Sequence, residues 1–480
     1  TIQFDGHDQM SRLGRFMYGD WISVSNTKYK FNGIHLKSWE GRYVDSWGSK
    51  HYRRVKVEGD NWEIIDEIKD FSHSGVLRWR CLQSPWKLVN NCLENKYFTL
   101  SVNSNGNVNI KIFEKIKNGL PPLAYLSNEF FEIEGKYLFA NSWSFVGFAH
   151  ELSRVGDIKP IQVAGQPLFI IRSSKKKIKA FHNVCSHRST KLINNPQNCK
   201  KLITCPYHRW SYNLNGELLA APFFGGQKTK LPKDFKLKNY GLEEVSCMIF
   251  KDWIFVNLNN NNESFEEYLK PLKKQLEGIN LGSFVPVASI EFKEIKANWK
   301  FLMENFIEPY HVQFVHKTTT SQPLSDHFII NDQHCLGSGV NLSIQQQTKA
   351  KKGSLSASSR YLTLFPNFVL GIYFPDQIGV HLNHPISSGI TNQIRVIYKH
   401  KDSDNSAKNI KNLKTLWENV HKEDHEICES LQKGRHSVVA EQGGLLSPHW
   451  EASVRKFQEL IVNSIRPALI KNSFQEGKNV

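Results

Sequence analysis

The sequence predicts an α+β protein in which two β-rich regions precede a mixed α/β region. Short apolar segments that alternate with polar residues fill much of the first half of the 480-residue chain, and a period of two is typical of strands. A Gly-Leu-Pro-Pro segment at 119–122 and an asparagine-rich segment at 257–262 separate the regions. The clearest helical periodicity lies in the second half, so the pattern is not a regular βαβ series.

Composition and charge are those of a globular protein with a basic surface. Apolar residues make up 40% of the chain and charged residues 22%, which excludes fibrous and wholly disordered classes. Lys and Arg outnumber Asp and Glu by 62 to 45, a net charge of +17. The excess is spread along the chain without a basic-aromatic module, so we expect no nucleic-acid partner. A solvated basic surface and an acidic protein partner are the two remaining interpretations.

Cysteine usage and hydropathy indicate where the chain resides. Eight cysteines are too few for a disulfide scaffold in a chain of this length and favour a reducing compartment. No run approaches the roughly 18 consecutive apolar residues of a membrane helix, and residues 1–10 lack the apolar core of a secretory signal. We therefore predict a cytoplasmic protein without a membrane span. Because Thr1 is not an initiator residue, an organellar location after removal of a leader stays open.

Residues 1–118 are predicted to form a separate β-rich domain. Six of the twelve tryptophans lie here, which a disordered tail would not contain. Alternating apolar residues on either side of Asn105-Gly106 predict a hairpin, and similar alternation over 52–64 predicts further strands. No group of chemically active side chains stands out, so the role of this domain is left open, with a separate binding role as one hypothesis. Residues 119–144 are interpreted as a linker and a lead-in helix.

Residues 145–258 are predicted to form a second β-rich domain. Leu168–Ile171 is a short apolar strand, and Asn215-Gly216 marks a tight turn. The apolar run Trp253–Val256 closes the domain. The remaining residues, 259–480, combine strands with two helices that carry candidate functional side chains.

Two Cys-His pairs in the second domain have the spacing of metal ligands. The pairs are Cys185-Ser186-His187 and Cys205-Pro206-Tyr207-His208, with seventeen residues between them. Each pair follows a short apolar strand, so both can lie on hairpin loops and close a four-ligand site. A zinc finger normally places both Cys before both His, whereas alternation suits a [2Fe-2S] cluster with two thiolates on one iron and two imidazoles on the other. The pattern C-x-H-x17-C-x2-H resembles the Rieske motif, with zinc and unrelated core residues as the alternatives.

A second group of candidate ligands lies near residue 310. Apolar residues at helical spacing predict a helix with one apolar face; they are Trp299, Leu302, Met303, Phe306 and Tyr310. The opposite face carries Glu304, Glu308 and His311. Pro309 is expected to kink this helix near Asn305, and a kink or a π-bulge could bring His311 and His316 together. The alternative is a pair of buried structural histidines.

The third ligand of such a site should be a carboxylate on another element. Apolar residues predict a helix over 408–433; they are Ile410, Leu413, Trp417, Val420, Ile427 and Leu431. Asp424 fills the gap in that apolar face, whereas Glu423 points off it. A lone buried carboxylate is costly unless it is paired, protonated or bound to a metal, so Asp424 is the candidate, with a structural ion pair as the alternative. With His311 and His316 it would form a two-His-one-carboxylate triad that leaves positions on Fe(II) open for O2 and substrate.

Together these residues resemble the catalytic α subunit of Rieske non-haem iron oxygenases, the aromatic-ring-hydroxylating oxygenase family. The resemblance covers about residues 125–475, from the opening Trp143–Gly147 through both metal motifs to the carboxylate helix. The segment Glu304–His311 looks like the choline, glycine betaine and carnitine monooxygenase branch, because Glu308 stands where many ring dioxygenases have Asp.

Two loop positions depart from the family pattern. Ser189 follows Arg188 in the first loop, and Arg209 lies between His208 and Trp210 in the second, where the family often has Gly at each position. The candidate ligands are unchanged, so these departures concern the loop conformation and the surface offered to a partner.

The resemblance implies a fold and a reaction. The fold is a β-rich Rieske domain at 145–258 inserted before a helix-grip-like mixed α/β catalytic domain at 259–480, with residues 1–118 as an extra domain. The reaction uses O2 and external electrons to hydroxylate a small organic substrate, with N- or O-demethylation or C–N cleavage as outcomes. The alternatives are an aromatic-ring dioxygenase and, from another class, a Rieske electron-transfer protein without oxygenase activity.

The resemblance also implies how electrons arrive. The chain has no G-x-G-x-x-G dinucleotide fingerprint and no plant-type ferredoxin spacing, so electrons from NAD(P)H must come through a separate reductase or ferredoxin. In the family they pass from the cluster to the mononuclear iron of the next subunit in a head-to-tail homotrimer. Glu308 would bridge a cluster histidine of one subunit to His311 of the next, and Asn305 is carried over as a second catalytic-site residue. The basic surface would suit an acidic donor.

The strands after the histidines are expected to line the substrate pocket. The candidates are Tyr361, Leu364, Phe365, Phe368, Tyr373 and Phe374. An aromatic set could cage a trimethylammonium group by cation–π attraction, bind a flat apolar ring, or be ordinary core. The sequence leaves these three interpretations open.

Overall fold

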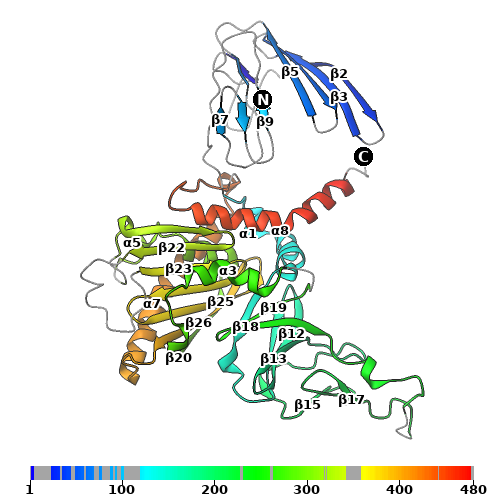
Figure 1. Ribbon diagram of the computed structural model, residues 1–480, viewed down its shortest axis with the longest axis vertical. Coiled ribbons are helices and arrows are strands. Elements are labelled where there is room, and N and C mark those ends of the chain that lie inside the picture. Colours follow the sequence, from blue (N-terminus) through cyan, green and yellow to red (C-terminus); the bar gives the residue numbers. More distant parts are fainter. Residues whose placement is uncertain are drawn as a thin grey trace. The chain divides into compact units, whose positions relative to one another are not determined.

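The computed structural model shows two compact units, Thr1–Glu114 and Lys115–Val480, which are described separately (Figure 1). The described residues are 2–4, 23–32, 35–44, 49–58, 61–69, 75–77, 87–89, 92–94, 99–101, 119–227, 231–259, 263–317, 319, 322–341, 358–441 and 443–476.

The first unit contains small antiparallel sheets. The largest joins, in sequence order, β2 (Ser23–Asn32), β3 (His35–Val44), β4 (Lys50–Glu58) and β5 (Asn61–Lys69). The others join β1 (Ile2–Phe4) to β6 (Gly75–Leu77), and β7 (Lys87–Val89) to β8 (Cys92–Glu94) and β9 (Thr99–Ser101). The strands β4 and β5 confirm the prediction over 52–64. The hairpin predicted at Asn105-Gly106 lies outside the described residues.

The second unit begins with short helices and a β-rich half. The helices are α1 (Leu123–Leu126), α2 (Asn128–Ile133) and a π-helical turn, Glu134–Leu138. A seven-stranded sheet follows in the order β10-β19-β18-β13-β12-β11-β14, and β15, β16 and β17 form a smaller sheet. Their bounds are β10 Ser144–Phe148, β11 Asp157–Val163, β12 Gln166–Ser174, β13 Lys177–His182, β14 Gln197–Asn198, β15 Leu202–Thr204, β16 Ser211–Asn213, β17 Leu218–Ala220, β18 Glu244–Phe250 and β19 Trp253–Asn257.

The predicted strands and turn of this half are confirmed. Leu168–Ile171 lies within β12, and Trp253–Val256 lies within β19. Gly216 turns the chain between β16 and β17 with φ +85°. A Cβ atom there would lie 2.5 Å from the ring of Phe181, so both the backbone conformation and the packing require glycine.

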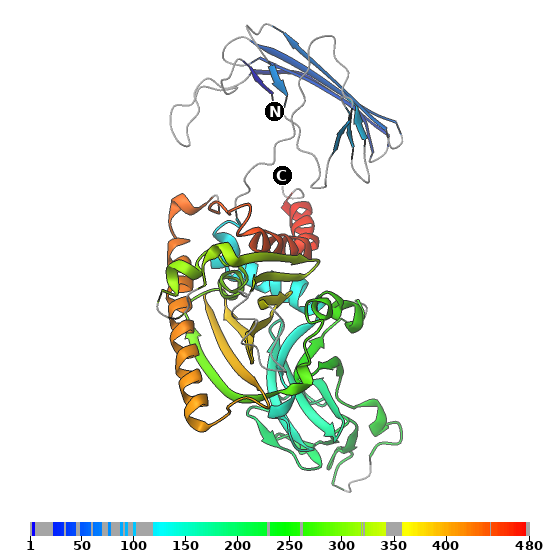
Figure 2. The same ribbon diagram turned by 60° about the vertical axis from the view of Figure 1, so that its left-hand side comes forward.

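The other half of the second unit is one antiparallel sheet with helices around it (Figures 1 and 2). The strand order is β20-β26-β25-β24-β23-β22-β21. The strands are β20 Phe284–Ile295, β21 His327–Asp332, β22 Cys335–Asn341, β23 Ser358–Leu364, β24 Phe368–Tyr373, β25 Gln377–Ser387 and β26 Ile390–His400. The helices are α3 Phe265–Gln275, α4 Trp299–Ile307, α5 Val312–Val315, α7 Ala407–Gly434 and α8 Ala452–Glu476. Among the described residues, no helix combines the length and apolar character needed to cross a membrane.

The two faces of this sheet are chemically different. The apolar face packs against β10, β19 and α3; from β25 it includes Ile378, Val380 and Leu382. Successive residues of a strand point to opposite faces, so Gly379, His381 and Asn383 face the other way although they are equally buried. This polar face lies toward α4, since the ring centroids of His381 and Phe306 are 4.9 Å apart. The long helix α7 packs on β20 at the edge of the same sheet.

A buried carboxyl group joins α1, α4 and α8. Glu304 Oε1 accepts hydrogen bonds from the Tyr125 hydroxyl at 2.7 Å and from Gln458 Nε2 at 3.0 Å. Burial raises the pKa of Glu304 to about 7, although these two hydrogen bonds oppose the shift. The face of α4 that carries Glu304, predicted to lie opposite the apolar face, is itself buried, because α1 and α8 cover it.

Replacing Glu304 with glutamine should remove a pH dependence of stability. A raised folded-state pKa means that the stabilising contribution is complete below the unfolded pKa near 4.5 and is lost as pH rises through about 7. The wild-type chain should therefore lose on the order of 3 kcal/mol between pH 4.5 and 8 from this group, whereas glutamine keeps both hydrogen bonds without a charge. Melting temperatures measured from pH 5 to 8 check this. Parallel pH profiles for the two proteins would count against it.

Candidate metal centres

The two Cys-His pairs lie on two loops of the first half of the second unit. An isolated bridge between Val184 and Lys191 closes the loop of Cys185 and His187. The hairpin of β15 and β16 carries the loop of Cys205 and His208. Both cysteines are buried, and the ring centroids of His187 and His208 lie 4.8 Å apart. The structure therefore places the two histidines side by side, and the Cys185 side chain also interacts with that of Cys205.

The two loops share one backbone design. In the first, the Cys185 N–H donates to Thr190 O and the Ser189 N–H donates to Cys185 O. In the second, the Cys205 N–H donates to Trp210 O and the Arg209 N–H donates to Cys205 O. Ser189 has φ +56° and Arg209 has φ +61°. Both non-glycine residues at the positions that depart from the family pattern are thus held in the left-handed region, and the loop geometry is retained at a cost of about 1 kcal/mol each.

Glycine at either position should stabilise the protein. Ser189→Gly and Arg209→Gly remove the left-handed strain, and we expect a gain of about 0.5–1 kcal/mol for each. Arg188→Gly is the matched control, because Arg188 is not among the positive-φ residues and glycine there only adds unfolded-state entropy. Thermal melts of the iron-loaded proteins check this. A loss of stability in both Ser189→Gly and Arg209→Gly would show that the side chains contribute more than the backbone.

The surroundings of these loops fit a cluster with sulfur and imidazole ligands. Cys185 Sγ lies 3.1 Å from the Tyr212 hydroxyl, which can donate a hydrogen bond to a thiolate. Trp210 stacks on His187 with a centroid distance of 4.8 Å. His208 Nδ1 is buried and has no hydrogen-bond partner in the described part of the chain. A buried ring nitrogen without a partner is costly unless it binds something. The Nδ1 atom of His208 is therefore suited to bind a metal ion.

The surface above the histidines is open and aromatic. A pocket of about 450 Å³ is lined by His187, His208, Arg209, Trp210, Pro222, Phe223 and Phe224. Tyr207 and Phe223 are the most exposed aromatics here, at 56% and 67% of their surface. These exposed aromatic side chains form an apolar patch beside the two histidines.

The second candidate site begins where α4 ends. The prediction of one kinked helix through His316 is wrong: α4 ends at Ile307, and Glu308 is extended with φ −104° and ψ 135°. The residue before proline avoids helical backbone, so Pro309 stops the helix instead of kinking it. His311 then caps the short helix α5 and His316 ends it. This break brings the two imidazoles together, with ring centroids 5.3 Å apart.

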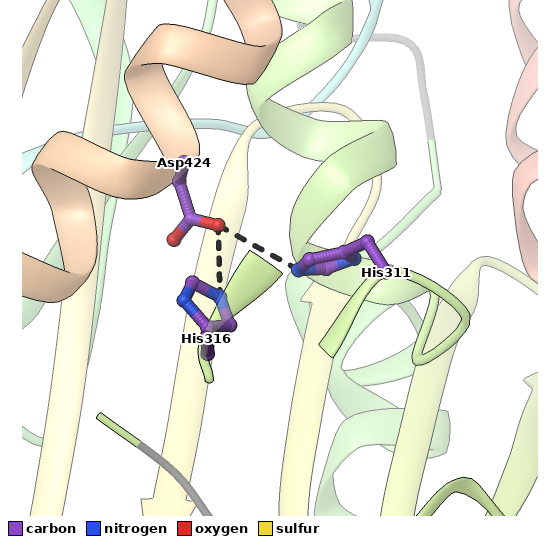
Figure 3. A group of neighbouring side chains, drawn as sticks. All are labelled: His311, His316 and Asp424. Carbon is purple, nitrogen blue, oxygen red and sulfur yellow. Dashed lines mark ion pairs between the residues drawn. The ribbon is translucent and has the colours of Figure 1, made fainter. Parts of the chain in front are cut away.

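Asp424 reaches the two histidines from α7 (Figure 3). Its Oδ1 atom lies 3.1 Å from His316 Nε2 and 3.6 Å from His311 Nε2. One donor atom from each of the three residues falls within 4.8 Å of the others. The predicted apolar face of α7 is wrong in its second half, since Ile427 and Leu431 are exposed. His421 and Cys428 are buried there instead, and Asp424 lies between them on the inner face.

The geometry and electrostatics of these residues suit a cation. Asp424 Oδ1 is buried, and among the described residues it accepts no well-aligned hydrogen bond despite its closeness to both rings. Burial lowers the pKa of His311, but Glu308 and Asp424 outweigh it and raise that pKa to about 10. Burial raises the pKa of Asp424, but the two histidines outweigh it and lower that pKa. In the metal-free protein protons therefore occupy this site, and a cation would replace them.

Two further carboxylates fix the orientation of the rings. His311 Nδ1 pairs with Glu308 Oε1, and His316 Nδ1 lies 2.8 Å from Glu423 Oε2. Each carboxylate accepts a hydrogen bond from Nδ1–H, so Nε2 is the ring nitrogen that would bind a cation at the centre. The sequence prediction assigned no role to Glu423; its position beside Asp424 was the available signal. Asn305 lies in the last turn of α4, two residues before that helix ends.

The aromatic candidates divide between the two faces of the sheet. Tyr361 and Tyr373 lie on the polar face, with ring centroids 5.6 Å apart. The prediction that Phe368 lines the pocket is wrong, because it pairs with Leu364 across β23 and β24 and packs in the apolar core. The prediction for Phe365 is wrong too, since its ring packs against Phe457 of α8. These two residues are core, which was one of the three interpretations.

Sequence reasoning missed buried polar residues on this face. His327 stacks near Tyr361, and both of its ring nitrogens are buried without a hydrogen-bond partner in the described residues. Arg395 and His381 are also fully buried. The available signal was alternation, because β25 and β26 place these residues between apolar ones. Only the packing of α4 shows that this polar face is covered.

Each half of the second unit matches a known domain family. Residues 142–239 match the Rieske [2Fe-2S] domain, and residues 281–466 match the catalytic domain of ring hydroxylating alpha subunits. The chain therefore contains a Rieske domain followed by a ring-hydroxylating alpha-subunit catalytic domain.

Individual relatives are similar over part of their length. The glycine betaine monooxygenase oxygenase subunit of Pseudomonas aeruginosa is 31% identical over 197 residues, which is 41% of this chain and 44% of that protein. The carnitine monooxygenase oxygenase subunit of Escherichia coli is 27% identical over 66% of this chain and 83% of that protein. The apo crystal structure of a quaternary ammonium Rieske monooxygenase covers 73% of this chain and 96% of its own, with TM-score 0.61 and 23% identity, which shows a shared fold.

Proposed function

We propose that this protein uses O2 and externally supplied electrons to hydroxylate a small organic substrate. The observation that carries the proposal is the open three-residue site of His311, His316 and Asp424 within 4.8 Å, in the same chain as a Rieske domain. A pure electron carrier needs no such site, because a facial triad leaves positions open for O2 and substrate.

The residues of the chain have separate roles in this proposal. Cys185, His187, Cys205 and His208 would hold a [2Fe-2S] cluster, and His311, His316 and Asp424 would hold one Fe(II). The iron would supply O2 activation and the cluster would supply single electrons. Glu308 and Glu423 keep the Nδ1 protons of the two histidines in place, so that both rings present neutral nitrogens. Asn305, at the end of α4, belongs to the same proposal as a residue beside the reacting groups.

Electron supply is proposed to need two further partners. A separate NAD(P)H-dependent reductase or ferredoxin would dock at the aromatic surface around His187 and His208, or on the basic surface of the chain. A second copy of the chain would bring its cluster near Glu308 in a head-to-tail homotrimer. The structure of a related quaternary ammonium Rieske monooxygenase is described as revealing inter-subunit electron transfer. The cysteine usage supports a cytoplasmic location as part of this proposal.

The substrate is proposed to be a quaternary ammonium compound. The relatives compared above act on glycine betaine and carnitine, and the aromatic pair Tyr361 and Tyr373 on the polar face would suit cation–π attraction. A hydroxylated carbon next to nitrogen would lead to demethylation or C–N cleavage. The second candidate is an aromatic ring, which the ring-hydroxylating catalytic domain supports.

Oxygen uptake coupled to product tests the proposal. The iron-loaded protein, a surrogate reductase and NADH would be supplied with glycine betaine, carnitine and simple aromatic acids in turn. Oxygenase activity predicts product in proportion to O2 consumed. NADH oxidation without product from any substrate, together with reversible cluster reduction, would favour the electron-transfer alternative.

A further inference from the structure

A buried guanidinium group lies on the polar face of the sheet, close to the candidate iron site. Arg395 of β26 is only 1% exposed. Its Nη1 atom bonds to His421 Nε2 at 2.9 Å, and His421 lies one turn before Asp424 on α7. The chain of aromatic contacts continues from Arg395 to Tyr373 and from Tyr373 to Tyr361. Arg395 is therefore linked through His421 to the helix that carries Asp424.

This guanidinium has no acidic partner among the described residues. Nη1 contacts only the Nε2 atoms of His381 and His421, each at 2.9 Å. Burial, followed by neighbouring positive charge, lowers the pKa of both histidines well below the ordinary value, so both rings are neutral acceptors. The indole of Trp417 lies 3.6 Å from the guanidinium carbon and offsets part of the charge. Asp424, which lies on α7 together with Trp417 and His421, pairs with His311 and His316 instead.

The free edge of Arg395 has the geometry of a carboxylate site. Nε and Nη2 are both buried and make no well-aligned hydrogen bond in the part of the chain that the structure describes, although the Tyr373 side chain lies close enough to interact with the guanidinium. These two nitrogens form one side of the guanidinium fork, and their N–H bonds run parallel, as bidentate binding of a carboxylate requires. An isolated buried cation with two open donors is strongly unfavourable unless an anion completes it.

Two glycines make room for the Arg395 guanidinium and the Tyr373 phenol. Gly371 and Gly379 are paired across β24 and β25. A Cβ atom at Gly379 would lie 2.5 Å from Arg395 Nη2, and one at Gly371 would lie 2.3 Å from the Tyr373 hydroxyl. Any side chain at either position would displace the guanidinium or the phenol, so the sheet is shaped around these two polar groups.

The geometry points to a substrate that carries an anionic oxygen group, bound side-on by Nε and Nη2 of Arg395 while another part of the molecule lies at the iron site. This inference rests on the proposed function and adds the chemical class of the substrate: a small carboxylic acid or zwitterion. Arg395 is the specificity-determining residue in this account. It discriminates acids from neutral analogues, because a neutral amide leaves the buried charge uncompensated.

Calorimetric binding to the anaerobic, iron-loaded protein tests this without turnover. The probes are three matched pairs: glycine betaine and its amide, carnitine and its amide, and benzoate and benzamide. We expect the wild-type protein to bind the acid of at least one pair about tenfold or more tightly than the amide, as for a hydrogen-bonded charge pair. A wild-type protein that prefers no acid over its amide, or binds none of the probes, overturns the inference, and this comparison does not depend on a variant folding.

Variants assign the preference to Arg395. Arg395→Gln should abolish the acid preference and Arg395→Lys should keep part of it. Arg360→Gln is the control, because Arg360 is a half-buried arginine on the opposite face of the same sheet, where it pairs with Ile372. If the folded Arg395→Gln protein lost acid binding and amide binding equally, the role of Arg395 would be structural. That result would overturn its assignment as the residue that selects acids. Acid-selective binding without O2 consumption would refute the proposed function while leaving the anion site in place.

Discussion

Replacing Asp424 with alanine should abolish product formation and leave the Rieske spectrum unchanged. Asp424 Oδ1 is the only carboxylate oxygen among the three atoms that meet within 4.8 Å, so without it two neutral imidazoles remain, which hold Fe(II) weakly. We expect iron to fall from about three to about two per chain while sulfide stays at about two. Turnover should fall by more than about 100-fold, because even removal of an outer-shell partner costs about 10–100-fold.

Iron and sulfide analysis of the purified variant, with turnover assays, makes this measurement. Asp402→Ala is the matched control, because Asp402 is a 75%-exposed aspartate of the same half of the chain. It should keep iron and activity. An Asp424→Ala protein with full iron and normal turnover would show that Asp424 is the structural ion-pair partner of the histidines and that the iron lies elsewhere.

Replacing Glu308 with glutamine should uncouple the two metal sites while leaving both occupied. Glutamine has the same shape and can still accept a hydrogen bond from His311 Nδ1, so the ring orientation is largely kept. The negative charge that pairs with His311, and that would contact a cluster histidine of the next subunit, is lost. We expect product formation to fall about 100-fold with iron near three per chain and normal cluster reduction by dithionite.

Single-turnover experiments with the prereduced protein measure that loss. Glu423→Gln is the comparison, because Glu423 holds the other iron-site histidine in the same way but has no proposed contact with a cluster. It should lower iron affinity and activity together, and added iron should restore activity. If the Glu308→Gln protein were rescued by iron in the same manner, its role would be ligand orientation alone, and the inter-subunit path would have to run through another residue.

The sequence predicted those parts of the molecule that local patterns specify. The strands of the Rieske half and the turn at Gly216 follow from alternation and turn chemistry. Asp424 was chosen over Glu423 because it interrupts a predicted apolar face. The structure does place it on the inner face of α7, but between His421 and Cys428 and not between the predicted apolar residues. The two Cys-His pairs were recognised as candidate cluster ligands from their spacing, because alternating thiolate and imidazole donors suit a [2Fe-2S] cluster.

The predictions that the structure corrected concern features that depend on tertiary packing. Pro309 was read as a kink within one helix, whereas its effect on Glu308 ends the helix and brings His311 and His316 together. Phe368 was assigned to the pocket because composition alone does not say which face of a strand is which. Arg395 was overlooked because a charged residue in an alternating strand usually faces solvent, and only the packing of α4 and α7 shows that this polar face is covered.

The most direct test of the account is the metal content and visible spectrum of the 480-residue chain purified without oxygen. The account predicts Rieske absorption that bleaches on addition of dithionite, with about three irons and two sulfides per chain. Two irons and two sulfides that rise to three irons on reconstitution would support it equally, since a mononuclear site with open positions loses metal easily. A colourless protein with one zinc and no sulfide would contradict both metal assignments and the oxygenase function.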